Sequence, residues 1–359
     1  MPSATIVGAG VFGAWIGYAL RQRGWTITLI EQHGPGNSRA SSGGETRIIR
    51  SGYGDHAIYA QWARDALPRW LALERQAAAP IFTRTGALFV GRNESWLRAT
   101  LHTLHQQRVT AEWIDPFQLA ARYSQLRFDD AAGAVFEPDA GVLFARRAVQ
   151  ALVRLLVSAG ATLISAKADA STLIRNSTDD ALIFAAGPWL PALFPDLLGD
   201  FIVPTRQEVF FLGASSADLP AWVAFDEGIY GLPDLEHRGV KVAIDAHGAP
   251  VDPETMDRVV DANAVTRIRE VLQRRLPALA EAPLLESRVC QYENTPDGHF
   301  LLDRLPGQDR VWIAGGGSGH GFKHGPSIGE YLADLIEARR TPDPMFAFAG
   351  RPSRARAVF

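Results

Sequence analysis

Three glycines near the start of the chain have the spacing of a turn that binds a nucleotide. Gly8, Gly10 and Gly13 follow the β-forming residues 5–7 and lead into a run of helix-forming residues that stops at Gly24. The first glycine allows a sharp turn, the second has no Cβ to hold a pyrophosphate away from the backbone, and the third lets the helix pack closely on the strand. The helix N-terminus then offers N–H groups and a partial positive charge to phosphates.

Glu31 indicates which dinucleotide the turn binds. It ends a second predicted strand, residues 26–30, and lies roughly 20 residues beyond the glycines. A carboxylate at this position accepts hydrogen bonds from a ribose 2′-hydroxyl, whereas it would repel a 2′-phosphate. We therefore expect FAD or NAD rather than NADP. The simpler interpretation is a glycine-rich turn in an ordinary β–α–β unit.

A second glycine cluster, GGGSGHGFK at residues 315–323, lies between a predicted strand, 311–314, and a predicted helix, 327–338. By the same reasoning, this turn can hold another part of a cofactor. His320 within it can be a structural loop histidine, so we assign it no proton-transfer role. An NAD dehydrogenase is possible from the first motif alone, but it has no use for this second cluster.

Two arginines follow the first predicted strand–helix–strand unit. Residues 41–50 read SSGGETRIIR, and Glu45 and Thr46 can start a helix. Arg47 and Arg50 are three positions apart, so on a helix they face the same way and can bind an anion together. Composition alone favours the simpler interpretation, in which both are solvent-facing charges.

Two later strands carry side chains of chemical interest. In the predicted strand 239–245, Lys241 alternates with Val240 and Val242 and therefore points to the opposite face. A lysine on a strand is usually a solvent-facing charge. Further along, Cys290 and Tyr292 are two positions apart, so on a strand they share a face.

The remaining patterns indicate how the chain is organised. Apolar periodicity predicts helices at 57–75, 96–108, 146–159 and 255–276, a short helix from Pro116, and strands at 82–90, 162–165, 180–187, 204–212 and 228–233, with a turn within 135–142. We expect an α/β protein in which residues 1–80, 141–204 and 281–359 form a nucleotide-binding domain. Residues 81–140 and 205–280 are then two insertions that form a substrate domain.

Composition excludes several classes of function. The chain has 359 residues, a net charge of −3 and no basic stripe, so we expect no nucleic-acid partner. No apolar run approaches the ~18 residues of a membrane-spanning helix, and the N-terminus enters a strand too early for a signal peptide. A single cysteine allows no internal disulfide, which favours a cytoplasmic location. We expect the arginines at 351, 354 and 356 to lie in a frayed, solvated end.

These motifs together resemble one family. GAGVFG with Glu31, TRIIR at residues 46–50, CQY at 290–292 with TPDGHF at 295–300, and GGGSGHGFK occur in order over nearly the whole chain. They resemble the sarcosine oxidase and N-methyltryptophan oxidase branch of the D-amino-acid oxidase superfamily of FAD enzymes. The resemblance implies a glutathione-reductase-like, Rossmann-type FAD-binding domain interleaved with a mostly antiparallel β-sheet substrate domain.

The resemblance also implies roles for individual residues. Cys290 matches the cysteine that carries FAD through an 8α-thioether, and Arg47 matches an arginine beside the isoalloxazine ring. Arg50 and Lys323 match the pair that clamps the substrate carboxylate. Lys241 matches the lysine that activates O₂, where a buried cation stabilises developing superoxide.

Other positions concern the substrate pocket. Tyr230 and Tyr292 match aromatic residues that line the amine pocket, where π faces can hold an N-alkyl group. Ser42 and Gly43 replace a pair of histidines of the family, and Asp245 replaces a pocket histidine. The carboxylate at Asp245 could attract a second cationic group, so we do not expect sarcosine itself to be the best substrate.

The expected function is FAD-dependent oxidation of the C–N bond of an N-substituted amino acid to an imine, with O₂ reduced to H₂O₂. The alternatives are a primary amino acid oxidase, a related dehydrogenase with another electron acceptor, and a flavin-binding protein without turnover. The expected partners are a small amino acid and O₂, in a monomer or simple homo-oligomer with no metal. The residues assigned to cofactor binding are Gly8, Gly10, Val11, Phe12, Gly13, Glu31, Ser41, Ser42, Gly43, Thr46, Arg47, Gly187, Trp189, Cys290, Gly315, Gly317, Gly319, His320, Gly321, Phe322 and Lys323.

Overall fold

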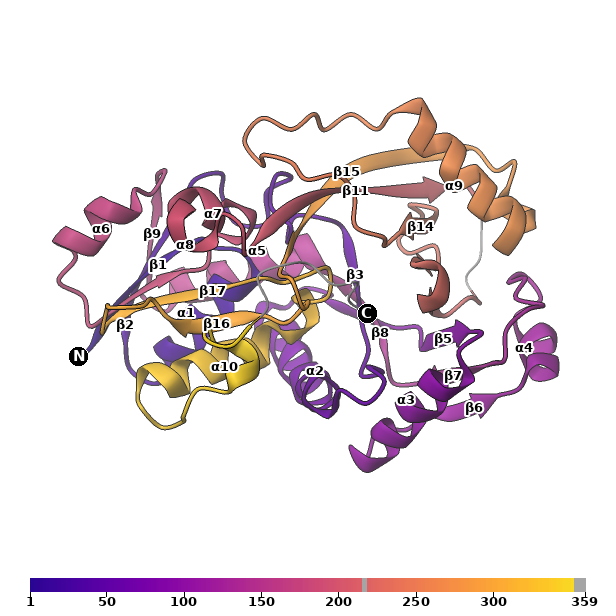
Figure 1. Ribbon diagram of the computed structural model, residues 1–359, viewed down its shortest axis with the longest axis horizontal. Helices are drawn as coiled ribbons and strands as arrows, with labels where there is room; N and C mark the ends of the chain where they lie inside the picture. The colour runs from indigo at the N-terminus through magenta and orange to yellow at the C-terminus, as the bar shows by residue number, and fades with distance from the viewer. Residues whose placement is uncertain (215–217, 352–359) are drawn as a thin grey trace.

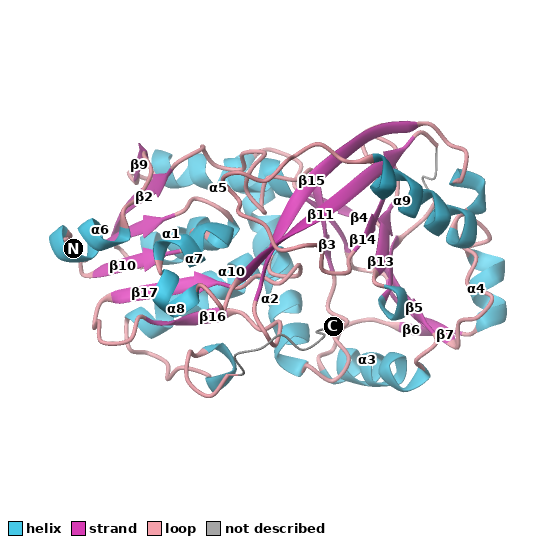
Figure 2. Cartoon of the chain, turned by 45° about the horizontal axis from the view of Figure 1, so that its top comes forward, coloured by secondary structure: helices cyan, strands magenta, loops and turns pink. Residues whose placement is uncertain are grey.

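The computed structural model describes residues 1–214 and 218–351. Figures 1 and 2 show two regions, one built on a mostly parallel sheet with helices on both faces and one built on a mostly antiparallel sheet. The predicted α/β fold class with a nucleotide-binding sheet and an antiparallel partner is therefore confirmed. The division into domains at the residue numbers given above stays a prediction.

Within the described residues, six strands form the first sheet in the order β16–β17–β10–β1–β2–β9. All neighbours in it are parallel except β16 and β17. Its strands are β1 (Ser3–Val7), β2 (Thr26–Glu31), β9 (Thr162–Ser165), β10 (Ala181–Phe184), β16 (Leu301–Arg304) and β17 (Val311–Gly315).

Helices cover both faces of this sheet, because successive side chains point to opposite faces and those of the central strands are apolar on both. Ile6 and Ile183 point into a core shared with α1 (Val11–Gln22), α2 (Ala57–Ala77), α5 (Ala145–Ser158) and α10 (Gly325–Ile336). Val7 and Phe184 point into a second core with α6 (Ala170–Asn176), α7 (Leu190–Leu193) and α8 (Pro195–Leu198). Short 3₁₀ turns, η1 (Gly187–Trp189), η4 (Phe322–His324) and η5 (Pro344–Phe346), complete the region.

The part of the chain that the structure describes also forms an eight-stranded sheet in the order β15–β11–β14–β13–β12–β5–β7–β6. Its neighbours are antiparallel except β5 and β12. The strands are β5 (Ala87–Gly91), β6 (Glu112–Ile114), β7 (Gly133–Glu137), β11 (Val203–Leu212), β12 (Ala221–Ala224), β13 (Ile229–Leu232), β14 (Val240–Ile244) and β15 (Leu284–Asn294).

The two faces of the second sheet are covered by different helices. The apolar side of α9 (Ala262–Arg275) and Leu119 of α4 (Pro116–Arg122) pack on one face. Leu97 and Leu104 of α3 (Glu94–Gln106) pack against Phe89 on the other. Two further 3₁₀ turns, η2 (Phe225–Glu227) and η3 (Pro277–Leu279), lie at its ends.

A small sheet of three described strands joins the two regions and corrects one prediction. It has the order β3–β8–β4, from β3 (Thr46–Ile49), β8 (Gly141–Phe144) and β4 (Phe82–Arg84). The predicted helix start at Glu45 and Thr46 is wrong, because Thr46, Ile48 and Ile49 are β-branched and pair with β8, far away in sequence. The arrangement that brings Arg47 and Arg50 into one site is therefore an extended segment and not one helical face.

Three smaller predictions also need correction. The strand expected at 82–90 is two strands, because Gly86 between them has a left-handed φ of 69°. The helix expected from residue 255 begins at Ala262, where Asp261 caps it by accepting a hydrogen bond from the Ala264 N–H at 2.7 Å.

Arg351 is not part of a frayed end: its buried guanidinium binds Asp297 and the carbonyl oxygens of His299 and Phe300. Arg354 and Arg356 lie outside the described residues. Over residues 1–214 and 218–351, no helix is both long and apolar enough to cross a membrane, and no group of three His, Cys, Asp or Glu side chains suits a metal ion.

Candidate active site

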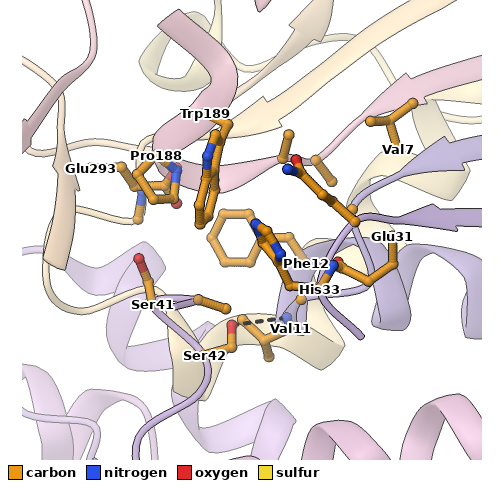
Figure 3. A pocket seen from close by; sticks show the side chains of 18 of the residues that line it. Val7, Val11, Phe12, Glu31, His33, Ser41, Ser42, Pro188, Trp189 and Glu293 are labelled. Carbon is orange, nitrogen blue, oxygen red and sulfur yellow. Dashed lines mark hydrogen bonds between the residues drawn. The ribbon is translucent and has the colours of Figure 1, made fainter. Parts of the chain in front are cut away.

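A first cavity of about 380 Å³ opens where β1 ends and α1 begins (Figure 3). Gly8 has a φ of 101°, which side chains rarely adopt, and a Cβ at Gly13 would come within 1.9 Å of the Gly8 carbonyl oxygen. A Cβ at Gly10 would meet only Ser42 Oγ, at 3.4 Å, because that glycine faces the cavity. The three glycines therefore have the structural reasons that their spacing predicts.

Side chains fix the entrance to this cavity. Glu31 accepts hydrogen bonds from the N–H groups of Ala9 at 2.9 Å and His33 at 3.0 Å, which holds the end of β2 against the glycine turn. Ser42 Oγ accepts from the Val11 N–H at 3.0 Å, so the loop after β2 closes over the N-terminus of α1. Both contacts hold polar groups at the lining of the cavity.

The cavity also contains buried polar atoms that lack partners. In the described part of the chain, His33 Nε2, Ser41 Oγ, Trp189 Nε1 and Glu293 Oε2 are buried without a hydrogen-bond partner, and all four residues line the cavity. Buried polar groups in proteins almost always have partners. The arrangement therefore fits a long, polar ligand that contacts several of these groups at once.

A second cavity of about 420 Å³ adjoins the first. The residues that line both are Ala40, Arg47, Tyr292, Gly319 and Phe322. Side chains from β3, β13, β14, β15 and η4 converge on the second cavity, so the two regions of the molecule meet here. A ligand in the first cavity can reach the second without leaving the protein.

Arg50 and Lys323 line this second cavity together. The guanidinium carbon of Arg50 lies 4.5 Å from the centroid of the Tyr53 ring and 4.9 Å from that of Phe225. Lys323 Nζ donates to Tyr53 Oη at 2.6 Å and to the His320 carbonyl oxygen at 3.0 Å. Two buried cations therefore share one aromatic neighbour and one cavity, as a carboxylate clamp requires.

The electrostatics of this pair favour an anionic ligand. Burial, with the nearby charge of Arg50, holds the pKa of Lys323 well below its usual value. Glu137, also buried, accepts from the Ser51 N–H at 2.8 Å, and burial raises the pKa of its carboxyl group to about 7. An incoming carboxylate would favour the charged form of Lys323, which the free site disfavours.

Lys241, Arg47 and Cys290 form a second group in the same cavity. Lys241 is only 3 % exposed and its Nζ donates to the Thr46 carbonyl oxygen at 3.1 Å. Burial, followed by the charge of Arg47, lowers the pKa of Lys241 to about 7. A guanidinium nitrogen of Arg47 lies 3.7 Å from Cys290 Sγ. The simpler interpretation of Lys241 as a solvent-facing charge is therefore wrong.

Asp245 supplies negative charge to a cavity otherwise rich in cations. Its carboxylate accepts a hydrogen bond from Tyr292 Oη at 2.5 Å, and Tyr230 lines the same cavity. Lys241 Nζ lies 5.6 Å from the centroid of the Tyr230 ring. Burial raises the pKa of Tyr292 well above its usual value, and the Asp245 charge raises it further. Burial and the Asp245 charge also raise the pKa of Tyr230. Both tyrosines therefore keep their hydroxyl protons.

Comparison with known proteins decides the family. Residues 3–335 match the family described as DAO, FAD dependent oxidoreductase. The chain belongs to this family. It is an FAD-dependent oxidoreductase, as the motifs predicted, and FAD, a long and polar molecule, fits the first cavity.

Curated relatives match over nearly the full length. The chain is 31 % identical to monomeric sarcosine oxidase of Bacillus sp. (strain NS-129), covering 96 % of this chain and 95 % of the relative. It is 30 % identical to peroxisomal sarcosine oxidase of Mus musculus, with 92 % and 91 % covered. Identity to N-methyl-L-tryptophan oxidase of Citrobacter koseri is 29 %, with 93 % and 94 % covered.

Solved structures share the fold at lower identity. L-proline dehydrogenase from P. horikoshii superposes with a TM-score of 0.81 at 21 % identity, covering 96 % of this chain and 95 % of that chain. Glycine oxidase from Geobacillus kaustophilus gives a TM-score of 0.79 at 21 % identity, with 98 % and 100 % covered. At this identity the likeness establishes the FAD oxidoreductase fold and not the substrate.

The structure distributes the predicted cofactor residues over both cavities. The first cavity is lined by Gly8, Gly10, Val11, Phe12, Glu31, Ser41, Ser42, Arg47, Gly187, Trp189, Gly317, Gly319, Gly321 and Phe322. The second is lined by Gly43, Thr46, Arg47, Cys290, Gly319, His320, Phe322 and Lys323.

In the described part of the chain, Gly13 and Gly315 line neither cavity: a Cβ at Gly315 would come within 2.2 Å of Leu190 Cδ1. Both glycines serve close packing behind the site. Sequence reasoning missed Tyr53, Glu137 and Glu293, because none of the three belongs to a recognisable motif.

Proposed function

We propose that this flavoenzyme oxidises the C–N bond of an N-substituted amino acid to an imine, with O₂ as the electron acceptor. The substrate loses two electrons and two protons, O₂ takes them up as H₂O₂, and water hydrolyses the imine. FAD, when bound, supplies the chemistry of accepting the electron pair from the carbon beside the amine and passing it on. The observation that carries the proposal is the convergence of Arg50 and Lys323 in the cavity that adjoins the FAD cavity.

Arg50 and Lys323 hold the carboxylate of the substrate in this proposal. A guanidinium and an ammonium fix its two oxygens, and thereby fix the adjacent carbon, without any covalent step. Tyr53 supports both cations: its ring lies beside the Arg50 guanidinium and its hydroxyl accepts from Lys323 Nζ. The Phe225 and Phe89 rings also lie beside the Arg50 guanidinium, with centroids 4.9 Å and 5.5 Å from its carbon atom.

Tyr230, Tyr292 and Asp245 hold the amine end. A cationic amine is attracted to the Asp245 carboxylate and to the π faces of the two tyrosines. The amine must lose a proton before its C–H bond can be oxidised, so we expect reduction of the enzyme by substrate to become faster as pH rises. A zwitterionic amino acid thus finds cations for one end and an anion for the other within one cavity.

The remaining residues act on the cofactor and on O₂. Cys290, 3.7 Å from an Arg47 guanidinium nitrogen, would hold FAD through a thioether to its ring. Arg47 would hold positive charge beside that ring, where it favours negative charge. Lys241 holds a proton where superoxide develops and stabilises that charge.

The curated relatives support an N-substituted substrate, since sarcosine oxidases and N-methyl-L-tryptophan oxidases are among those with about 30 % identity. Asp245, which lines the second cavity, supports a substrate that differs from sarcosine in charge. A primary amino acid oxidase or a dehydrogenase would use the same clamp and is distinguished by experiment.

The experiment is a screen of the purified yellow protein for O₂ consumption and H₂O₂ production with N-methyl, cyclic imino and primary amino acids. We expect turnover with N-methyl or cyclic imino acids and little with their primary counterparts. Turnover restricted to primary amino acids would replace the proposal with the amino acid oxidase alternative. Reduction of an artificial dye without O₂ consumption would replace it with a dehydrogenase.

A further inference from the structure

Glu293 is a buried carboxyl group that the proposed reaction does not use. It lies at the end of β15, next to Tyr292, is 8 % exposed, and lines the FAD cavity beside Pro188 and Trp189 (Figure 3). Its Oε1 accepts from the Gly317 N–H at 3.2 Å, and its backbone oxygen accepts from the Ser318 N–H at 3.1 Å. Glu293 therefore holds the second glycine turn with both its side chain and its backbone.

The other carboxyl oxygen, Oε2, has no hydrogen-bond partner among the described residues. Glycines surround this group: a Cβ would lie 3.1 Å from a Glu293 carboxyl oxygen at Gly317, 3.5 Å at Gly187 and 3.7 Å at Gly315. These three positions expose backbone to the carboxyl group and offer no side chain. The protein thus leaves one oxygen facing the cavity without a donor or a cation.

The titratable groups on the surrounding elements are engaged elsewhere. Tyr292 donates to Asp245, and His320 contacts Tyr53 and the Gly298 carbonyl oxygen. On β11, Arg206 pairs with Glu208; η1 and β17 carry no charged side chain. His33 packs beside Trp189, with ring centroids 5.9 Å apart.

A buried carboxylate without a cation is unfavourable, so the group favours its neutral, protonated form. In agreement, burial raises the pKa of the Glu293 carboxyl to about 7, with only the Gly317 and Gly316 N–H groups opposing the shift. A protonated carboxyl group has one O–H donor, and this donor needs an acceptor. A ligand in the cavity can supply this acceptor.

We infer that Glu293 is an FAD-binding residue that keeps its proton and donates it in a hydrogen bond to an oxygen atom of the ribityl–diphosphate chain. The negative diphosphate reinforces this state, because it repels a carboxylate and accepts from a carboxylic acid. The inference rests on FAD binding and is independent of the substrate. Loss of the proton leaves two like charges in one buried cavity and weakens the cofactor's attachment.

The test measures FAD release from the holoenzyme of a Cys290→Ser parent, in which no covalent link can mask the affinity. Flavin fluorescence after dilution reports the release rate from pH 6 to pH 9. We expect the rate to rise about tenfold or more above pH 7 in the parent, since one pKa unit of differential binding corresponds to a factor of about ten. Glu293→Gln, which is neutral at every pH and keeps an N–H donor, should release FAD slowly with a flatter profile.

Glu286→Gln is the matched control, because Glu286 lies on the same strand, binds Arg238 and Arg288, and lines neither cavity in the described structure. It should follow the parent profile. Lys241 titrates in the same pH range, but it is present in both proteins. Subtracting the Glu293→Gln release profile from the parent profile therefore removes the effect of Lys241 on FAD release. A Glu293→Gln profile as steep as that of the parent would overturn the inference.

Infrared difference spectra give a second readout that needs no turnover. The carbonyl band of protonated carboxyl groups in the holoenzyme at pH 6.5 should lose intensity in Glu293→Gln, while the contribution of Glu137, whose pKa is also raised to about 7, stays in both proteins. If Glu293→Gln does not fold, the parent carrying Glu137→Gln decides: a remaining protonated-carboxyl band that shifts when FAD is released supports the inference. A spectrum of that protein without such a band contradicts it.

Discussion

The two cavities of this FAD-dependent oxidoreductase are built from different materials. The first is lined by two glycine turns and the N-terminus of α1, and among the described residues its buried polar atoms without a partner belong to His33, Ser41, Trp189 and Glu293. The second is formed by ionisable side chains from distant strands, with Arg47, Arg50, Lys241 and Lys323 gathered around one cavity. The backbone cradle of the first cavity includes one buried carboxyl group, Glu293, without a cation among the described residues, whereas the second cavity concentrates basic side chains whose charge a bound anion stabilises.

This difference indicates that the first cavity should determine FAD binding and the second should determine the reaction rates. Burial lowers the pKa of both Lys241 and Lys323, so each cation is less stable in the free site than in water. Groups whose charge is disfavoured in the free site gain most when an opposite charge arrives. Substitutions of these basic side chains should therefore change rates far more than they change retention of FAD.

Cys290 provides the largest expected effect. Acid precipitation of the wild-type protein should leave the flavin in the pellet, whereas Cys290→Ser should release essentially all of it into the supernatant. Before acid treatment, the variant should stay yellow through desalting, because the first cavity binds FAD without the link. Free flavin in the wild-type supernatant would refute the covalent bond, and a colourless variant would show that the backbone cradle alone is insufficient.

Lys241→Met should slow reoxidation of the reduced enzyme by O₂ by about 10²–10³-fold, the usual cost of removing one preorganised charge-stabilising group. Anaerobic reduction by substrate should change by no more than a few-fold. Stopped-flow absorbance separates the two half-reactions. An equal fall in both would contradict the O₂ role of this lysine.

The pH dependence of the same step sharpens this prediction. The pKa of Lys241 is lowered to about 7, so its charged form is present below that value and is lost as pH rises through it. The negative charge of the reduced cofactor moves this transition upward. Reoxidation should therefore decline at or above pH 7 in the wild type, and the decline should be absent from Lys241→Met.

Arg50→Ala should raise KM for substrates with a carboxylate by about 10²-fold, as expected for losing hydrogen bonds to a charged group. Amines that lack a carboxylate should react equally well, or equally poorly, with both proteins. Steady-state kinetics on one such pair of substrates provides the measurement. An equal loss for both would place Arg50 in general packing, beside Tyr53 and Phe225, rather than in the clamp.

The sequence predicted the first cavity better than the second, for physical reasons. The β1–α1–β2 unit is local: its glycines, helix and Glu31 lie within 31 residues, and the predicted boundaries agree with the structure to within a few residues. The predicted helix start at Glu45 and Thr46 is wrong, because the β-branched Thr46, Ile48 and Ile49 form a strand whose partner β8 lies far along the chain, where local patterns do not show it.

The spacing of Arg47 and Arg50 indicated an anion site, but the roles of the other side chains of the second cavity were accessible only through the family resemblance. Lys241 on its strand has the pattern of a surface charge, and nothing in its neighbours reveals that β13 and β3 bury it. Tyr53 and Glu137 lie outside every motif and reach the clamp through tertiary contacts alone. Glu293 had one usable signal, a carboxylate three positions after Cys290 in a strand that leads toward the second glycine turn.

The pairing of strand β15 limits which mutations this protein can tolerate during evolution. Its pairing with β11 is unbroken from Val203 to Phe211, and along it Cys290 faces the second cavity while Glu293 lines the first. Deleting one residue of β15 before Cys290 would turn every later side chain of the strand to the opposite face of the sheet. Both cavities would then lose lining residues together. Single substitutions in β15 can therefore be tolerated one at a time, whereas insertions or deletions within the strand should be selected against. Tolerated insertions should occur in the loops that flank it.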